Sequence, residues 1–241
     1  MAHPVGCSPW RRFSFHRIRS SLHLCVFASL REIDENIPRS RKARKVLLTT
    51  SPANNSLLDR NGLLAIGCVV AAAVIVLNIE GRRWWCPAGD LSPWSWDIWS
   101  QHNSQHLVDP YSFTHILHGV LEFWLLSLLF PRLKLAWRLF LAVLIESSWE
   151  IAENSSYVIN RYREETISLA YFGDSIINSL SDIVCCATGF TIAYKLRFWR
   201  SLALFLITET VLIFWIHDSL IINIIMLLYP IQGIKTWQLP H

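Results

Sequence analysis

The stretch FTHILHGVLEFWLLSLLF, residues 113–130, decides the fold class of this chain. As a helix it is long enough to cross a bilayer, because about 20 apolar residues span the hydrocarbon layer. It also carries His115, His118 and Glu122, which fall within an arc of about 60° around a helix. An apolar helix with one ionisable stripe is typical of a membrane bundle that turns its polar groups inward, away from lipid.

Other apolar runs accompany this one, at residues 62–79, 135–151, 173–194, 201–217 and 220–229. The first has no charged residue and would span about 27 Å as a helix. The last is too short to span and ends at Pro230, so it can be a re-entrant segment, an interfacial segment or half of a broken hairpin. We predict an all-α fold: a polytopic transmembrane bundle with about five spanning helices and this short C-terminal segment.

The composition supports a membrane protein. Hydrophobic residues make up 52% of the chain and charged residues 17%, where soluble domains carry about 25% charged residues. The basic residues do not form an aromatic-interleaved surface, so we expect the lipid bilayer and no nucleic acid as a partner. None of the six cysteines lies in a CxxC pair or is spaced for zinc.

Residues 1–60 differ from the rest of the chain, since they hold half of the 22 Lys and Arg residues and no acid before Glu32. Such a segment can be a targeting peptide, a cytoplasmic tail or the result of a miscalled start, and we favour the last two. We therefore predict two parts: a basic N-terminal extension over residues 1–60 and a transmembrane domain over residues 61–241.

The basic residues of the loops predict the orientation, because cytoplasmic loops carry an excess of Lys and Arg. Outside the extension, the turns near residues 132–138 and 195–200 hold six basic residues, against four in segments 81–112 and 153–172. We expect the N-terminus in the cytoplasm, with Lys134 and Arg197 inside and Trp96 and Arg161 outside.

Two further helices carry polar stripes. Glu146, Glu150 and Glu153 share one face of the run 135–151 and its end, and Asp174, Asn178 and Asp182 share one face of the next, within about 60° and 80°. In the predicted orientation all the stripes fall in the outer halves of their helices. We therefore predict one polar cavity near the outer face, with His118, Glu150 and Asp182 facing one another.

This cavity supplies the candidate site residues. The catalytic candidates are His115, His118, Glu146, Glu150, Asp174 and Asp182, and the candidates for a divalent metal ion are His115, His118, Glu122, Glu150 and Asp182. The candidates for ligand binding are His102, His106, Asp109, Arg161, Arg163, Asn178, His217 and Asp218. The structural alternative is interhelical hydrogen bonding, worth about 0.6 kcal/mol per bond.

Four strings of the sequence resemble one family: SQHLVDPYSFTHILHG (104–119), IESSWEIAEN (145–154), RYREETISLAYFGDSIINSLSDI (161–183) and HDSLIINIIMLLYPIQGIKTWQ (217–238). This is an uncharacterised bacterial family of integral membrane proteins, found mainly in alphaproteobacteria. The resemblance covers about residues 62–238 and implies a multi-pass protein of the cell inner membrane. It brings no activity with it, and residues 1–55 depart from its pattern.

A weaker similarity of layout is to VanZ-like membrane proteins, which place an Asp and a His before one helix, a Glu on the next, and an Asp and an Asn at the start of another. Asp109, His115, Glu146 or Glu150, Asp174 and Asn178 follow that order. Likeness of layout alone does not assign a function.

The sequence leaves three hypotheses open. The first is an envelope-related membrane protein whose cavity binds a ligand or relays protons. The second is an intramembrane enzyme in which a divalent metal activates water to hydrolyse a lipid-linked substrate, with Arg161 and Arg163 holding a phosphate. The third is a purely structural role for the polar stripes. The sequence contains no complete metal signature and no GxSxG motif.

Overall fold

The computed structural model of this chain describes residues 57, 59–166, 168 and 171–239. The predicted N-terminal extension lies outside these residues, apart from Leu57, Asp59 and Arg60. Within the described part the regular elements are helices, accompanied by one isolated bridge between Trp94 and Val108. The predicted all-α fold is confirmed.

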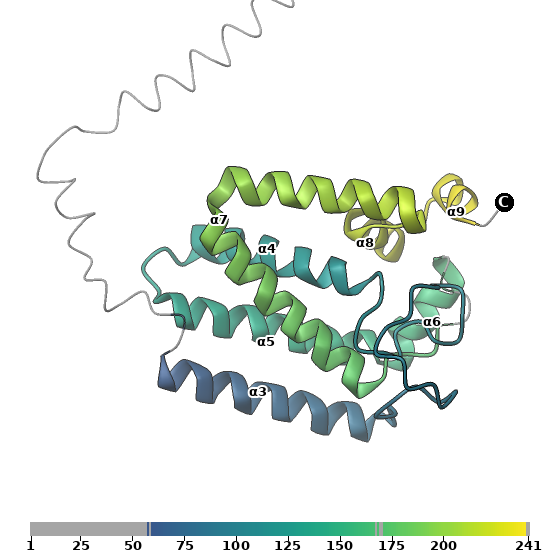
Figure 1. The fold of residues 1–241 in the computed structure, drawn as a ribbon, viewed down its shortest axis with the longest axis horizontal. Coiled ribbons are helices and arrows are strands. Elements are labelled where there is room, and N and C mark those ends of the chain that lie inside the picture. Colours follow the sequence, from purple (N-terminus) through teal and green to yellow (C-terminus); the bar gives the residue numbers. More distant parts are fainter. Residues whose placement is uncertain (1–56, 58, 167, 169–170, 240–241) are drawn as a thin grey trace, which may run out of the picture. The chain divides into compact units, whose positions relative to one another are not determined.

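Long helices form a bundle in the described part of the chain (Figure 1): α3 (Arg60–Ile79), α4 (Ser112–Leu129), α5 (Leu135–Glu153) and α7 (Ile176–Ile216). The short helices α6 (Ser156–Glu165), α8 (Leu220–Leu228) and α9 (Gln232–Gln238) gather at one end of it, together with the loop of residues 80–111. Three helices, α3, α4 and α7, are long and apolar enough to cross a membrane.

Helix α7 consists of two arms that meet at Arg197 and lie back toward one another (Figure 1). The backbone of Arg197 has φ 64° and ψ 176°, which is not helical. A positive φ is uncommon for a residue with a side chain, and here it reverses the chain without a separate loop. The two arms correspond to the predicted runs 173–194 and 201–217.

Helix α4 crosses the first arm of α7 with the two backbones in close contact. A Cβ atom on Gly119 would lie 1.9 Å from the carbonyl oxygen of Cys186, and one on Gly189 would lie 1.9 Å from that of Ile116. Only glycine fits at both positions. Small residues let membrane helices approach in this way, because backbone packing replaces the hydrophobic force that is missing in lipid.

Apolar side chains fill the bundle around this crossing. Leu126, Val143, Ile183 and Phe190 are buried in one cluster between α4, α5 and α7. Phe123 packs edge-on against Phe190, with ring centroids 5.2 Å apart. Helix α3 contacts α5 near its start, where a Cβ on Gly62 would lie 3.3 Å from that of Ala136.

Helix α6 is a feature that the sequence analysis did not anticipate, because its polar sequence lacks an apolar run. It begins where the Ser155 hydroxyl accepts a hydrogen bond from the Val158 N–H at 3.4 Å, the usual cap of a helix N-terminus. Its inner face buries Ile159 and Tyr162 against Tyr171.

The segment 220–229 is the nine-residue helix α8, too short to cross a bilayer. Its first N–H groups are held by Glu209 on the second arm of α7, whose carboxylate accepts from Leu220 at 3.0 Å and from Ile221 at 3.2 Å. An acid within an apolar arm thus satisfies the unpaired donors of a neighbouring helix.

The glycine crossing predicts a steric effect. Gly119→Ala and Gly189→Ala should each push α4 and α7 apart, at a cost of about 1–3 kcal/mol, because the added methyl meets rigid backbone. Gly67→Ala on α3 is the matched control, since nothing lies within 4 Å of its Cβ position. Thermal unfolding in detergent measures the effect, and equal melting temperatures for all three variants would contradict it.

Candidate functional site

Three helices bring ionisable side chains together next to the glycine crossing, one turn closer to the loop end of the bundle. His115 of α4 lies at the centre. Its Nδ1 is 2.5 Å from Oε1 of Glu146 and 3.4 Å from Oε1 of Glu150, both on α5. Its Nε2 is 3.9 Å from Oδ2 of Asp182 on α7. All four side chains are buried. Together with His118 they form the group that we call the buried cluster.

Glu146 extends this group in two directions. Its Oε2 lies 3.0 Å from Nδ1 of His118, one turn along α4 from His115. It also lies close to Glu122 and Cys186, whose Sγ donates to Oε2 of Glu122 at 3.0 Å. Cys186 is therefore the hydrogen-bond partner of a buried acid.

We predicted that His118, Glu150 and Asp182 face one another, and the structure replaces one member of this set. All three point into the bundle, but His115, and not His118, stands next to Glu150 and Asp182. The angular positions of the two histidines do not show which one contacts Asp182, because both lie on the same stripe of α4. Only the axial offset between α4 and α7 distinguishes them.

The carboxylates of this cluster are not fully satisfied within the protein. Both oxygens of Glu150 and Oδ1 of Asp182 are buried without a hydrogen-bond partner. Nδ1 of His115 lies 3.4 Å from Oε1 of Glu150, but it is directed to Glu146. Buried polar groups nearly always have partners, and buried charges are paired or bind metals. The cluster therefore has unused acceptor atoms that protons, water molecules or a metal ion could satisfy.

The donor set fits a metal ion. His115, Glu150 and Asp182 each offer a ligand atom, and these atoms lie within 4.8 Å of one another; the same holds for His115, His118 and Glu146. The two sets share His115. Imidazole and carboxylate ligands suit Mn²⁺, Fe²⁺ and Zn²⁺.

A cavity of about 60 Å³ adjoins the cluster and is lined by residues that include His115, His118, Tyr162, Asp174, Asp182 and Asn223. This volume holds a few water molecules or a small polar group. Two of its walls come from α6 and α8, so the short helices enclose the same end of the bundle where the cluster lies.

Asp174 faces this cavity but belongs to a separate hydrogen-bonded group. Its Oδ2 accepts from the amide of Asn154 at 2.8 Å, and its Oδ1 accepts from the Tyr171 hydroxyl at 2.9 Å. Burial outweighs these hydrogen bonds and raises the pKa of Asp174 to about 6. Asn154 and Tyr171 were not among the predicted residues, although both lie inside the strings that carry the family resemblance.

Asp109 and Asn178 hold the loop of residues 80–111 onto the bundle. Asp109 accepts hydrogen bonds from the N–H groups of Tyr111 at 2.7 Å, Ser112 at 3.1 Å and Ser104 at 3.1 Å. The amide of Asn178 donates to the carbonyl oxygen of His106 at 2.9 Å. These contacts favour a structural role for both residues over ligand binding.

The two arginines proposed for phosphate binding are occupied by backbone carbonyls. Nε of Arg161 donates to the carbonyl oxygen of Leu227 at 3.1 Å, and Nε of Arg163 donates to that of Tyr171. Arg161 also lies 3.3 Å from Glu165. These contacts tie α6 to its neighbours.

The remaining candidates lie away from the cluster. His217 ends α7 in the left-handed region, and its exposed ring packs on Trp237. His102 and His106 lie in the loop before α4, beside Cys86. Cys86 escaped the sequence analysis because it has no cysteine partner and stands 16 residues from the first of these histidines.

Asp218, between α7 and α8, is buried and accepts hydrogen bonds from the Ser219 N–H at 2.9 Å and the Tyr111 hydroxyl at 3.3 Å. Burial, the larger influence, raises its pKa from 3.8 to about 6. Because the folded state holds this proton more tightly, Asp218 contributes stability that is full below about pH 4 and lost as the pH rises through 6.

This shift predicts a pH-dependent difference between Asp218→Asn and the wild type. From pH 4 to pH 7 the wild type should lose about 3 kcal/mol relative to the variant, the equivalent of a shift from 3.8 to about 6. Thermal unfolding in detergent across this range measures it. The exposed Asp97→Asn is the control and should follow the wild type; parallel curves for all three proteins would contradict the prediction.

Comparison with known proteins connects this site to a family. The family described as "Protein of unknown function (DUF2585)" matches residues 77–240. The chain is 42% identical over 170 residues to a UPF0314 protein of Paracoccus denitrificans, covering 70% of this chain and 88% of the relative. It is 42% identical over 177 residues to one of Brucella anthropi, covering 73% and 90%.

A UPF0314 protein of Sphingopyxis alaskensis is 39% identical over 181 residues, covering 75% of this chain and 96% of the relative. No solved structure matches the chain. The matched region contains every residue of the buried cluster. The chain therefore belongs to the uncharacterised, mainly alphaproteobacterial DUF2585 family, as its sequence motifs predicted.

Proposed function

We propose that this chain is a multi-pass protein of the cell inner membrane whose buried cluster binds a divalent metal ion. In this proposal α3, α4, α5 and the two arms of α7 are the five spanning segments. The cluster and its cavity lie near the outer face, and the N-terminus is in the cytoplasm, as the distribution of Lys and Arg predicts.

The apolar surface of the described helices supports the membrane part of the proposal. Only 17% of the most apolar 18-residue stretch of α3 is buried by the protein. Leu128, Trp199 and Phe214 are 78%, 77% and 80% exposed on α4 and α7. A soluble monomer rarely exposes continuous apolar surface on this scale, whereas lipid would cover it.

The observation that carries the metal part is Glu150, fully buried with neither carboxylate oxygen hydrogen-bonded. Asp182 faces it across His115. Three carboxylates and two imidazoles converge here, so ionised acids would leave a net negative charge in a medium where an unpaired charge is very costly. A divalent ion between His115, Glu150 and Asp182 would supply the missing positive charge.

The adjoining cavity supports hydrolysis as the reaction class. It is lined by His115, His118 and Asp182, so a water molecule in it would lie next to the metal. A metal-bound water is acidic enough to form a nucleophilic hydroxide near neutral pH. The substrate class we propose is a lipid-linked molecule that reaches this end of the bundle from the membrane.

Mn²⁺ is the test ion, because carboxylate-rich sites suit it and thiolate sites do not. The purified, metal-free chain in detergent should bind Mn²⁺ in a calorimetric titration. His115→Ala and Glu150→Gln should weaken binding by more than about 100-fold, since changes even to outer-shell residues cost 10- to 100-fold. Asp218→Asn, a buried acid outside the cluster, should bind like the wild type.

Stability measured on the same variants separates a functional cluster from interhelical hydrogen bonding. Glu150→Gln should melt at or above the wild-type temperature, because removing an uncompensated buried charge relieves its desolvation. We expect Glu150→Gln to fail to complement a deletion strain, although a normal amount of the variant protein is present in the membrane. Wild-type protein that binds no Mn²⁺ would overturn the metal proposal and leave the proton as the cation.

The proposed topology is tested by cysteine labelling. In a chain without its native cysteines, Trp96→Cys should react with an impermeant thiol reagent in intact cells, and Lys134→Cys should react only after lysis. Both positions are exposed, so accessibility within the protein does not limit either reaction. The reverse pattern would place the cavity on the cytoplasmic side.

A further inference from the structure

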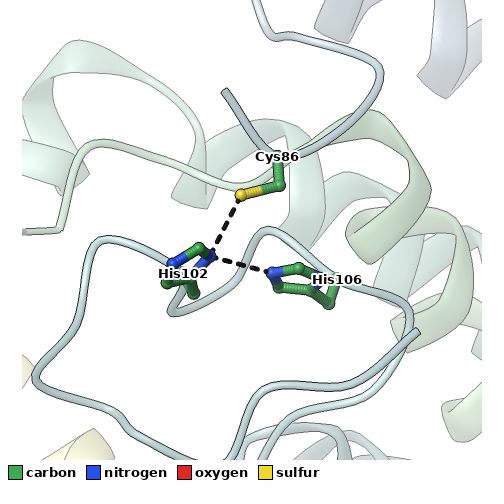
Figure 2. Close-up of side chains that lie close together, drawn as sticks. All are labelled: Cys86, His102 and His106. Carbon is green, nitrogen blue, oxygen red and sulfur yellow. Dashed lines mark hydrogen bonds between the residues drawn. The ribbon is translucent and has the colours of Figure 1, made fainter. Parts of the chain in front are cut away.

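A second group of metal-ligating side chains lies in the loop of residues 80–111, outside the buried cluster. Figure 2 shows Cys86, His102 and His106 with their polar atoms directed toward one another. Sγ of Cys86 lies 3.3 Å from Nδ1 of His102, and the same Nδ1 lies 3.3 Å from Nε2 of His106. The three ligand atoms all lie within 4.8 Å of one another.

We propose that Cys86, His102 and His106 bind one transition metal ion of the zinc type through Sγ, Nδ1 and Nε2. This proposal does not depend on the buried cluster. The thiol loses its proton to solvent when the metal binds, so the site gains a thiolate and two neutral imidazoles as ligands.

Two of the three spacings between the donor atoms are close to those of tetrahedral zinc. With Zn–N near 2.05 Å and Zn–S near 2.3 Å, tetrahedral angles place two nitrogens about 3.3 Å apart, and a sulfur and a nitrogen about 3.5 Å apart. The nitrogen–nitrogen distance here is 3.3 Å and the sulfur–nitrogen distance is 3.3 Å. The third pair, Sγ of Cys86 and Nε2 of His106, lies within 4.8 Å, so a small side-chain movement would let all three atoms reach one ion.

The choice of nitrogen atoms argues against a catalytic Cys–His relay. In such a relay the histidine contacts the nucleophile through one ring nitrogen and its orienting partner through the other. Here Nδ1 of His102 makes both contacts. Atoms that converge on one point can coordinate an ion, whereas they cannot pass a proton through the ring.

The surroundings of His106, the third ligand, orient its ring for metal binding. Nδ1 of His106 lies 2.5 Å from the carbonyl oxygen of Ser92 and donates to it, which leaves the lone pair of Nε2 facing His102. Metal-bound histidines usually have this outer hydrogen bond, which sets the tautomer and the ring orientation. His106 is fully buried, its ring packs edge-on against Trp85, and Asn178 holds its carbonyl oxygen.

The ligand set favours zinc over copper. Two histidines and one cysteine also form blue-copper sites, which add a weak axial ligand that is most often Met. The single methionine of the described residues, Met226, lies in α8 with its sulfur near the Ile231 N–H. Three protein ligands leave one tetrahedral position for water or substrate, and the half-buried His102 provides access to it.

Co²⁺ reports on this site selectively, because a thiolate ligand gives a charge-transfer band that nitrogen and oxygen ligands do not give. The full chain in detergent, freed of metal by chelation, should develop this band with one equivalent of Co²⁺ and lose it when Zn²⁺ is added. Cys86→Ser should abolish the band, and His106→Ala should weaken Co²⁺ binding by more than about 100-fold.

Two control variants test whether Cys86 is the cysteine that gives the band. Cys68→Ser changes an exposed cysteine on α3, and Cys186→Ser changes the cysteine beside Glu122; both variants should keep the band. A band that survives Cys86→Ser, or one that disappears only in Cys186→Ser, would overturn the proposal. So would the absence of any band in the wild type.

A second measurement needs no substitution and remains valid if Cys86→Ser does not fold. Zn²⁺ should slow the alkylation of Cys86 by at least about tenfold in the native chain, since the bound thiolate is withheld from the reagent. Mass spectrometry of the Cys86 peptide follows this rate, with the Cys68 peptide as the internal reference. Equal rates for Cys86 with and without Zn²⁺ would count against the site.

Discussion

The structure depends on the backbone contact between α4 and α7. At Gly119 and Gly189 each helix occupies the space that a side chain of the other would need. This contact sets the axial offset of the two helices, and the offset places His115 opposite Asp182, one turn nearer the loop end. Helix α5 then completes the group with Glu146 and Glu150. A separation larger by one methyl group would lengthen the distance between His115 and Asp182.

The polar groups at this end of the bundle fall into two kinds. Asp109, Glu209 and Asn178 are used by backbone groups, so they hold a loop, the start of α8 and the start of α7 in place. Glu150 and Asp182 have oxygens that the protein leaves without partners. The same residue types thus serve structure where donors surround them, and remain available for chemistry where donors are missing.

The sequence predicts the helices and the stripes, because a helix has a fixed angular period and apolar length is directly visible. It predicts that His115, Glu146, Glu150 and Asp182 share one interior. Angular period alone does not tell His115 from His118, since that needs the depth of one helix relative to another. It also misses α6, whose polar sequence is stabilised by a cap and by Tyr162, and Cys86, whose partners depend on the path of an irregular loop.

The reversal of α7 at Arg197 has a consequence for the far end of the chain. Because the second arm returns to the end where the first began, α8 becomes a wall of the cavity, and α9 follows it with Lys235 near the backbone of Glu164. The C-terminal segment therefore lies at the same end of the bundle as the site. In the proposed membrane topology, a reporter enzyme fused after α9 would reveal on which side of the membrane the cavity opens, without any alteration to the bundle itself.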